Sequence, residues 1–164
     1  MASMYWQVAL DALAAWLRAD APFAALVTHA RGDTTVVDIA QGRTAAMDPP
    51  CARLYRGPQG DSEGTAYRGP LSEIPATFTL FLDLHAPDVP DRDDDLSASE
   101  AWAALAAIEA EAMRCVRAFF APTRSMTSIL GAPYWCSLNG PNPVGEEYHP
   151  AVASRLTITL NKIG

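Results

Sequence analysis

The first strong pattern of apolar positions lies between residues 5 and 27. Apolar residues recur there at spacings of three and four, as in Leu10, Leu13 and Leu17, which predicts a helix with one apolar face. Pro22 disfavours helical backbone in the residue before it, so we expect an interruption at residues 20–22. A short second helical segment should then continue to about Val27.

A longer helical pattern covers residues 97–120. It opens with a capping box, in which Ser97 and Glu100 can satisfy backbone donors that a helix start leaves without partners. We therefore predict that this helix begins at Ser97. Its predicted buried stripe consists of Ala101, Leu105, Ile108, Ala112, Cys115 or Val116, and Phe119, with Trp102 beside it.

Four segments favour β-strands. Residues 77–85 are the clearest, because Leu80, Leu82 and Leu84 alternate with polar or aromatic residues and predict one core-facing side. Residues 34–40 and 51–55 are rich in β-formers, and residues 154–161 alternate again. The last segment is expected to be a half-buried strand.

Two long segments lack either periodicity. Residues 56–70 are polar and glycine-rich, with Arg-Gly-Pro at each end, and we expect a long hairpin arm at about 56–73. Residues 122–150 are expected to be mostly loop, with turns marked by glycine, proline and asparagine at 139–143. Within this loop, Tyr134 and Trp135 predict a short strand or an aromatic anchor.

These elements predict an α+β fold in a single domain over residues 1–164: a mixed or antiparallel sheet covered by two main helices. The net charge is −7, and Lys162 is the one lysine, which disfavours binding to nucleic acid because phosphate contacts need clustered cations. No signal-peptide pattern and no apolar run of about 18 residues occur, so a soluble cytosolic protein is expected.

Candidate chemistry is sparse. Cys51, Cys115 and Cys136 lie far apart without a C-x-x-C pair, so we expect reduced thiols and no zinc or redox motif. Asp83 and His85 share the second face of the strand at 77–85 and are the one pair suited to general acid–base work. A surface or interface hydrogen-bonding role explains this pair better than catalysis, because the sequence shows neither a third catalytic group nor a pocket.

The acidic loop at 88–95 has some features of a calcium site. Asp91, Asp93 and Asp95 match positions 1, 3 and 5 of an EF-hand loop, but Leu96 replaces the required glycine and Trp102 the bidentate glutamate. A solvated loop next to a helix N-terminus explains the carboxylates better, since the helix dipole favours them. Whether the loop binds an ion stays open, and no catalytic, cofactor or metal residue is assigned.

The order of elements resembles the tail terminator, or tail completion, proteins of long-tailed bacteriophages. The features that carry the resemblance are the opening helix over residues 10–26, the strand over 78–85 with a polar loop into an alanine-rich helix, and the late strand over 155–160. The similarity covers nearly the whole chain as a pattern of elements. The long loop at 122–150 departs from it.

The resemblance implies a structural virion protein at the neck of the tail, made in the host cytoplasm. It implies a hexameric ring that caps the tail tube, receives a head–tail connector or stopper protein, and lets DNA pass without specific binding. Six copies would carry roughly −42, a field that disfavours binding of that DNA. The candidate subunit or partner contacts are Arg56, Gln59, Asp61, Glu63, Tyr67, Arg68, Tyr134 and Trp135.

Two alternatives remain open from the sequence. One is another ring protein of the phage neck or tail tube, which would share the fold and the acidic charge. The other belongs to a different class: a small acidic enzyme or ligand-binding domain that uses Asp83 and His85. A ring-sized mass favours the first two functions, and a monomer or dimer with a pocket at that strand end favours the third.

Overall fold

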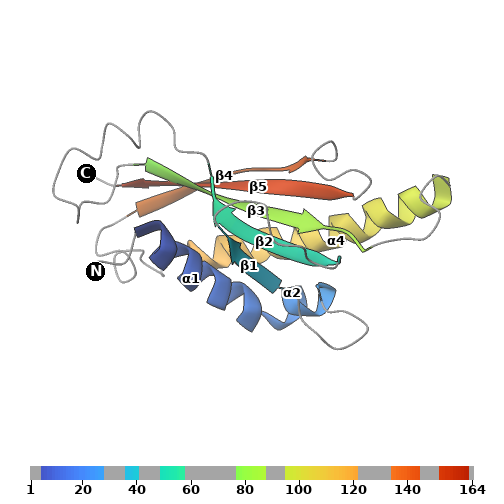
Figure 1. Ribbon diagram of the computed structural model, residues 1–164, viewed down its shortest axis with the longest axis horizontal. Coiled ribbons are helices and arrows are strands. Elements are labelled where there is room, and N and C mark those ends of the chain that lie inside the picture. Colours follow the sequence, from blue (N-terminus) through green and yellow to red (C-terminus); the bar gives the residue numbers. More distant parts are fainter. Residues whose placement is uncertain are drawn as a thin grey trace.

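The fold is α+β, with helices packed on one face of a sheet (Figure 1). The computed structural model describes residues 5–27, 36–40, 49–57, 77–87, 95–121, 134–144 and 152–162. The elements in these ranges are α1 (Tyr5–Ala19), α2 (Ala21–Leu26), β1 (Val36–Ala40), β2 (Cys51–Arg56), β3 (Thr77–His85), α4 (Asp95–Phe119), β4 (Tyr134–Pro143) and β5 (Ala153–Lys162).

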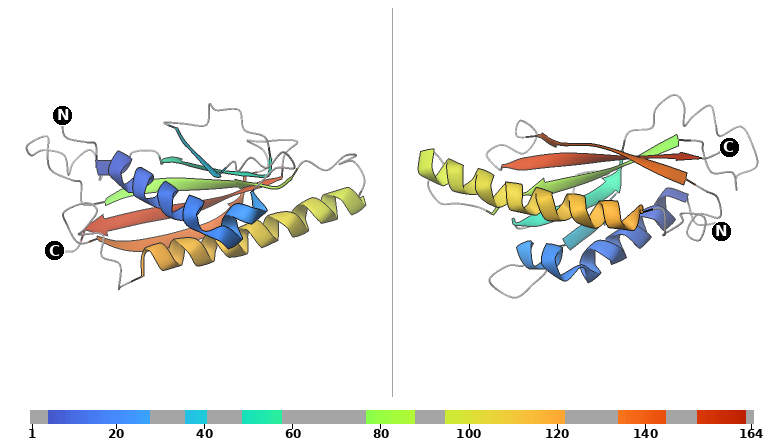
Figure 2. Two further views of the ribbon diagram at one scale, coloured as in Figure 1. Left: turned by 90° about the horizontal axis from the view of Figure 1, so that it is seen from below. Right: turned by 180° about the vertical axis from the view of Figure 1, so that it is seen from behind.

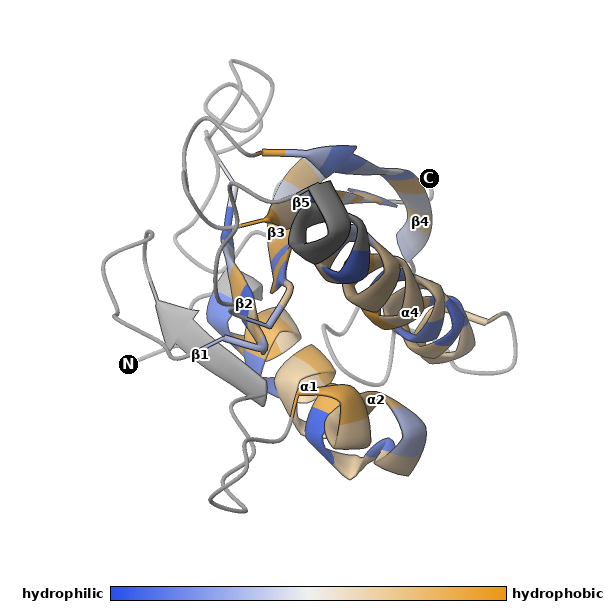
Figure 3. Cartoon of the chain, turned by 90° about the vertical axis from the view of Figure 1, so that its right-hand side faces the viewer, coloured by the Kyte–Doolittle hydropathy of each residue, from blue (hydrophilic) through white to orange (hydrophobic). Residues whose placement is uncertain are grey.

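The strands form one sheet in the order β1-β2-β3-β5-β4. β2, β3, β5 and β4 pair antiparallel, and β1 lies parallel to β2 at one edge, so the sheet is mixed, as predicted. The helices lie on one side of this sheet when it is seen along its strands (Figure 3). α1 packs on β1 and β2, whereas α4 packs on β3 and β5.

The core lies between the helices and the sheet. Leu80, Leu82 and Leu84 of β3 are fully buried on the helix side, as the alternation in the sequence predicts. The matching side chains of β5 are Leu156, Ile158 and Leu160, which are also fully buried. The alternation of apolar and polar residues in each strand therefore gives the sheet one apolar face, and most of the polar and charged side chains lie on the other face.

The predicted interruption of the first helix is confirmed. α1 ends at Ala19, and Asp20 caps α2 by accepting a hydrogen bond from the backbone amide of Phe23 at 2.9 Å. Pro22 lies in the first turn of α2, where its missing amide hydrogen costs nothing. α1 and α2 are thus two helices joined at Asp20.

The long helix carries the buried stripe that was predicted, including Leu105, Ile108 and Phe119. Its predicted start is wrong: α4 begins at Asp95, two residues before the capping box, so Ser97 lies inside the first turn. The acidic residues ahead of the box suit the positive end of the helix dipole, which explains the earlier start.

Polar contacts join α1 and α2 to α4. The indole nitrogen of Trp16 donates to the backbone oxygen of Cys115 at 2.9 Å, and the guanidinium of Arg114 donates to Asp20 at 2.6 Å. The hydrogen bond from Arg114 holds the pKa of Asp20 below its ordinary value. The residue that caps α2 therefore also fixes its position against α4 (Figure 2).

The prediction of a loop with turns at 139–143 is wrong. Those residues belong to β4, a ten-residue outer strand that pairs with β5 through a register shift between Asn139 and Asn142. Gly140 supplies the positive φ of 101° at this bulge. Proline is tolerated at a bulge of an outer strand because a ladder hydrogen bond is not required there. The turn-forming residues therefore mark a bulge in this chain.

The predicted hairpin arm at about 56–73 starts at the end of β2, but residues 58–76 lie outside the described ranges. Its flanking strands, β2 and β3, are antiparallel neighbours, as an arm between them requires. The acidic loop at 88–94 is likewise outside the described ranges. None of the helices in the described part of the chain is long and apolar enough to cross a lipid bilayer.

Replacing Gly140 with alanine should destabilise the fold by at least about 2 kcal/mol, because a side chain strains the positive φ. The new Cβ would also lie 2.6 Å from the backbone oxygen of Arg155. Urea unfolding measures this cost. Ser137→Ala, at an exposed position of the same strand, serves as the control and should change stability by no more than about 0.5 kcal/mol. Equal stability of Gly140→Ala and wild type would contradict the strand geometry at this bulge.

Candidate functional site

The helix-free face of the sheet carries the outward side chains of the strands. In register they form rows across β2, β3 and β5, and one such row aligns Arg53, Asp83 and Arg155. These residue types are unusual at the centre of a sheet because charges there are shielded from water. The row places the predicted Asp83 beside cations from two neighbouring strands.

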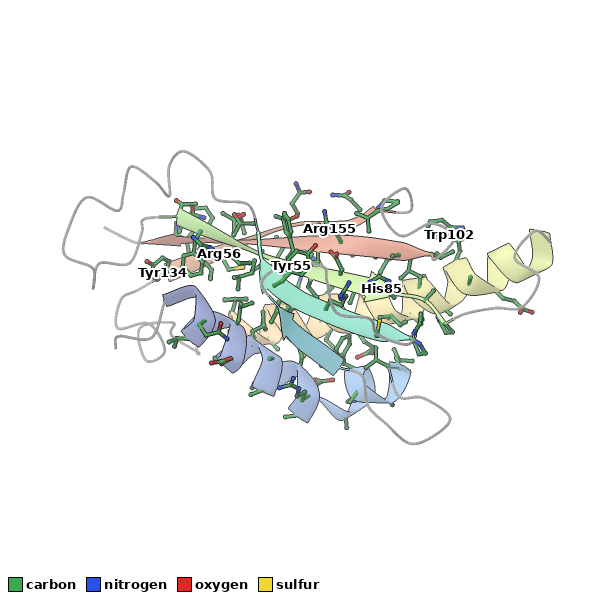
Figure 4. All side chains as sticks on the ribbon, viewed as in Figure 1. Tyr55, Arg56, His85, Trp102, Tyr134 and Arg155 are labelled. Carbon is green, nitrogen blue, oxygen red and sulfur yellow. The ribbon has the colours of Figure 1, made fainter. Side chains whose placement is uncertain are left out.

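Asp83 is fully buried, and its carboxylate accepts hydrogen bonds from Tyr55 and Arg155, which are labelled in Figure 4. Arg155 donates from Nε to Oδ1 at 2.7 Å and from Nη2 to Oδ2 at 3.0 Å, which is a bidentate pair. The hydroxyl of Tyr55 donates to Oδ2 at 2.7 Å, and Arg155 Nη2 also donates to that hydroxyl at 2.8 Å. We call Tyr55, Asp83 and Arg155 the ionic cluster.

Aromatic rings enclose the guanidinium of the ionic cluster. Its central carbon lies 4.7 Å from the ring centre of Phe81 and 5.9 Å from that of Tyr55. The two rings meet edge to face, with centres 5.6 Å apart. This geometry adds cation–π attraction to the ion pair and keeps water from competing for its hydrogen bonds.

Such a cluster holds the three strands in one register. A buried carboxylate without partners costs several kcal/mol, whereas one with a bidentate arginine and a hydroxyl is compensated. The partners come from β2 and β5, on either side of β3. A shift of either strand by one residue would turn its partner to the opposite face of the sheet.

His85 lies two residues beyond Asp83 on the same face and is 6% exposed. Burial lowers the pKa of His85 from 6.5 to about 4, and Arg53 lowers it further, although the charge of Asp83 acts in the opposite direction. The imidazole is therefore neutral at pH 7. A neutral histidine accepts or donates hydrogen bonds but supplies no positive charge to a ligand.

The structure therefore places Asp83 and His85 on the same face of β3, as predicted, but the hydrogen bonds of Asp83 are unlike those of a general base. Both oxygens of Asp83 already accept hydrogen bonds from Arg155 and Tyr55. A general base needs an accessible lone pair directed at a substrate proton, whereas this carboxylate is fully buried and directed at Arg155 and Tyr55. This geometry serves structure better than proton transfer.

In the described part of the chain, the thiols and carboxylates likewise form no reactive site. Cys51, Cys115 and Cys136 are free thiols, and burial raises the pKa of both Cys115 and Cys136 to about 12. Such thiols are poor nucleophiles at neutral pH. Within the described ranges, no group of three histidine, cysteine or carboxylate side chains is arranged to hold a metal ion.

The predicted interface residues fall into three groups. Gln59, Asp61, Glu63, Tyr67 and Arg68 lie outside the described ranges. Arg56 ends β2 and is half-buried, and Tyr134 is buried, with its ring centre 5.6 Å from that of Phe78. Trp135 is 52% exposed on the outer strand β4. Of the predicted residues that the structure describes, Trp135 is the one with a large exposed apolar surface.

Two important residues were not predicted. Arg155 lies in the segment for which the sequence predicts a half-buried strand, but its pairing with Asp83 follows from the strand order, which the alternation does not encode. Trp102 is 48% exposed on α4, and it is the second large exposed apolar side chain in the described part of the chain. The position of Trp102 beside the buried stripe, and not within it, is the feature of the sequence that indicates its exposure.

Comparisons of the chain with protein-family models, with curated proteins and with solved structures give no match.

The Arg155→Met variant should lose about 3–5 kcal/mol of stability, because it removes the bidentate cation that compensates the buried Asp83 carboxylate. The double variant Asp83→Leu/Arg155→Met should lose less than Arg155→Met alone, since it removes the charge as well. Denaturant unfolding measures both values. The control is Arg117→Met at an exposed position of α4, which should change stability by no more than about 0.5 kcal/mol. A double variant that is less stable than Arg155→Met would contradict the compensated-charge account.

Stability should fall as the pH drops from about 6.5 to 4. In this window the unfolded chain protonates His85 and the folded chain does not, so protons favour unfolding. The contribution at pH 4 is on the order of 1–3 kcal/mol. His85→Gln removes it, so the stability of the variant relative to wild type should improve between pH 7 and pH 4 in urea unfolding. A difference that stays constant over this range would show that His85 titrates normally.

Proposed function

We propose that this protein is a tail terminator of a long-tailed bacteriophage. A tail terminator forms a ring of six copies at the neck of the virion. The ring caps the tail tube and receives the head–tail connector or stopper protein. DNA passes through the ring without specific binding. The protein acts by shape and surface complementarity, without catalysis and without a cofactor.

The observation that carries the proposal is the placement of the two exposed tryptophans. Trp102 lies toward one end of the long axis of the molecule, and Tyr134, the chain neighbour of Trp135, lies toward the other (Figure 4). Subunits in a ring contact each other through two different surfaces, one on each side of the subunit. Tryptophan is the residue type most enriched at the energetic centres of such contacts. Two separate surfaces, each with one exposed tryptophan, therefore suit a ring.

The charge supports the same function. Each chain has a net charge of −7, and DNA would be repelled by the summed field of several copies. A protein that surrounds DNA during its passage benefits from weak interaction, because bound phosphates would slow the movement. The α+β fold and the order of its elements also agree with what the resemblance implies.

An enzyme that uses Asp83 and His85 is less well supported. Arg155 and Tyr55 occupy both oxygens of Asp83, and His85 is 6% exposed. Another ring protein of the phage neck or tail tube would share every feature named above. Binding to the end of purified tail tubes, seen by electron microscopy, distinguishes a terminator from these relatives.

The mass of the assembled protein tests the ring. Light scattering of the purified protein should give six times the 17.6 kDa of one chain, and negative-stain images should show a ring with a central hole. A compact monomer both alone and in the presence of tail tubes would overturn the proposal.

Mixing two blocked variants tests whether the contact joins different surfaces. Trp102→Glu and Trp135→Glu should each be monomeric, because each has lost one side of the contact. An equimolar mixture should form heterodimers and nothing larger, since each partner contributes its one intact side. Rings from either variant alone would contradict the assignment of that tryptophan to the contact. Unchanged unfolding temperatures of both variants provide the control for folding.

A further inference from the structure

Among the described residues, one half of the helix-free face consists of positions with uncharged side chains. Three neighbouring strands each present three outward side chains, and these side chains are in register from strand to strand. They are Thr77, Thr79 and Phe81 of β3, Thr157, Thr159 and Asn161 of β5, and Trp135, Ser137 and Asn139 of β4. These side chains are threonine, serine and asparagine, with Phe81 at one corner and Trp135 at another. We call this set the neutral face.

The neutral face contrasts with the rest of the chain. About a quarter to a third of the surface residues of a soluble protein are charged, so a block of this size would ordinarily hold two or three charges. Among the residues of this side whose side chains the structure describes, the charged ones are Arg53, Asp83 and Arg155, which lie in the adjoining half and are largely buried. The β4 part of the neutral face is the most accessible, since Ser137 and Asn139 are exposed and Trp135 is 52% exposed, whereas the positions on β3 and β5 are half-buried.

The edge of the sheet next to the neutral face lacks charge too. β4 is an outer strand, and none of its residues from Tyr134 to Pro143 is charged. Outer strands usually carry charged residues, especially lysine, which prevent pairing with other molecules. The bulge and the two prolines protect only the second half of β4, so the half that contains Trp135 has no such protection.

We propose that the neutral face is the surface on which a second copy of this chain docks. The proposal rests on the proposed function, because it names the surface through which copies in the ring meet. Depletion of charge together with an exposed tryptophan is the composition that marks the centre of a protein–protein contact. The face measures roughly 13 Å along the strands and 10 Å across them, which suits the centre of a contact with a rim around it.

The charges of the chain favour a second copy of it, rather than nucleic acid or an anionic membrane, as the partner of the neutral face. Two copies at −7 repel each other, and the neutral face adds no carboxylate of its own to a contact between them. Nucleic acid and anionic membranes would need clustered lysine or arginine, and the neutral face has none. Threonine, serine and asparagine each donate and accept hydrogen bonds, so they can satisfy an uncharged surface of another copy.

A single added charge on the neutral face tests the proposal. Ser137→Glu should raise the protein concentration at half-assembly at least tenfold, because the contact would have to bury a carboxylate. Thr159→Glu, on the strand position opposite Ser137, should act in the same way. Ala15→Glu adds the same charge at an exposed position of α1 and should leave assembly unchanged. Light scattering over a dilution series measures all four proteins, and thermal unfolding checks that each variant is folded.

The outcomes separate this proposal from the proposed function. Wild-type rings that persist in Ser137→Glu and Thr159→Glu would overturn the neutral face as the contact and leave the ring intact. Dimers that both substitutions dissociate would support the neutral face and contradict the hexamer. A wild-type protein that remains monomeric at every concentration, or a control that dissociates as readily as the two variants, would overturn the neutral face.

Discussion

The buried ion pair between Asp83 and Arg155 is the constraint on which the sheet depends. A carboxylate with no exposure at the centre of β3 is tolerated only because Arg155 of β5 and Tyr55 of β2 both donate to it. This requirement fixes two strand pairings at one point. It therefore also fixes which side chains of β2, β3 and β5 face the helices and which face away.

The two faces of the sheet then have different tasks. The helix side is apolar and supplies the hydrophobic stabilisation, with α1 and α4 covering Leu82, Leu156 and their neighbours. The other side has an ionic half, which holds the register, and a neutral half, which remains accessible. In this account assembly uses the half of the sheet that the fold itself does not need.

Local patterns in the sequence were sufficient for most of the fold. The break at Asp20, the buried stripe of α4 and the alternation in β3 and β5 follow from spacing and from proline chemistry, which act within a few residues. The sequence predicts only a short strand or an aromatic anchor at Tyr134 and Trp135 and misses the rest of β4, because its asparagines, glycine and prolines are the same residues that form turns. Only pairing with β5 across a bulge makes them a strand. The start of α4 was misplaced because the acidic residues before the capping box extend the helix.

The candidate site was less predictable, since it depends on contacts between distant segments. Asp83 and Arg155 are 72 residues apart, and nothing near either residue indicates the other. Trp135 was among the predicted contact residues, but its neighbour Tyr134 is buried, and Trp102 was not predicted because it lies beside a buried stripe. Strand order determines the pairing of Asp83 with Arg155, and a single sequence encodes strand order only indirectly.

Hydroxyl-radical footprinting at low and high protein concentration is the most direct measurement of the central claim. Assembly through the neutral face should lower the oxidation rate of Trp135 several-fold, while Trp16, which is half-buried between α1 and α4, keeps its rate. Oxidation of Trp135 at the same rate in assembled and dissociated protein would contradict the account.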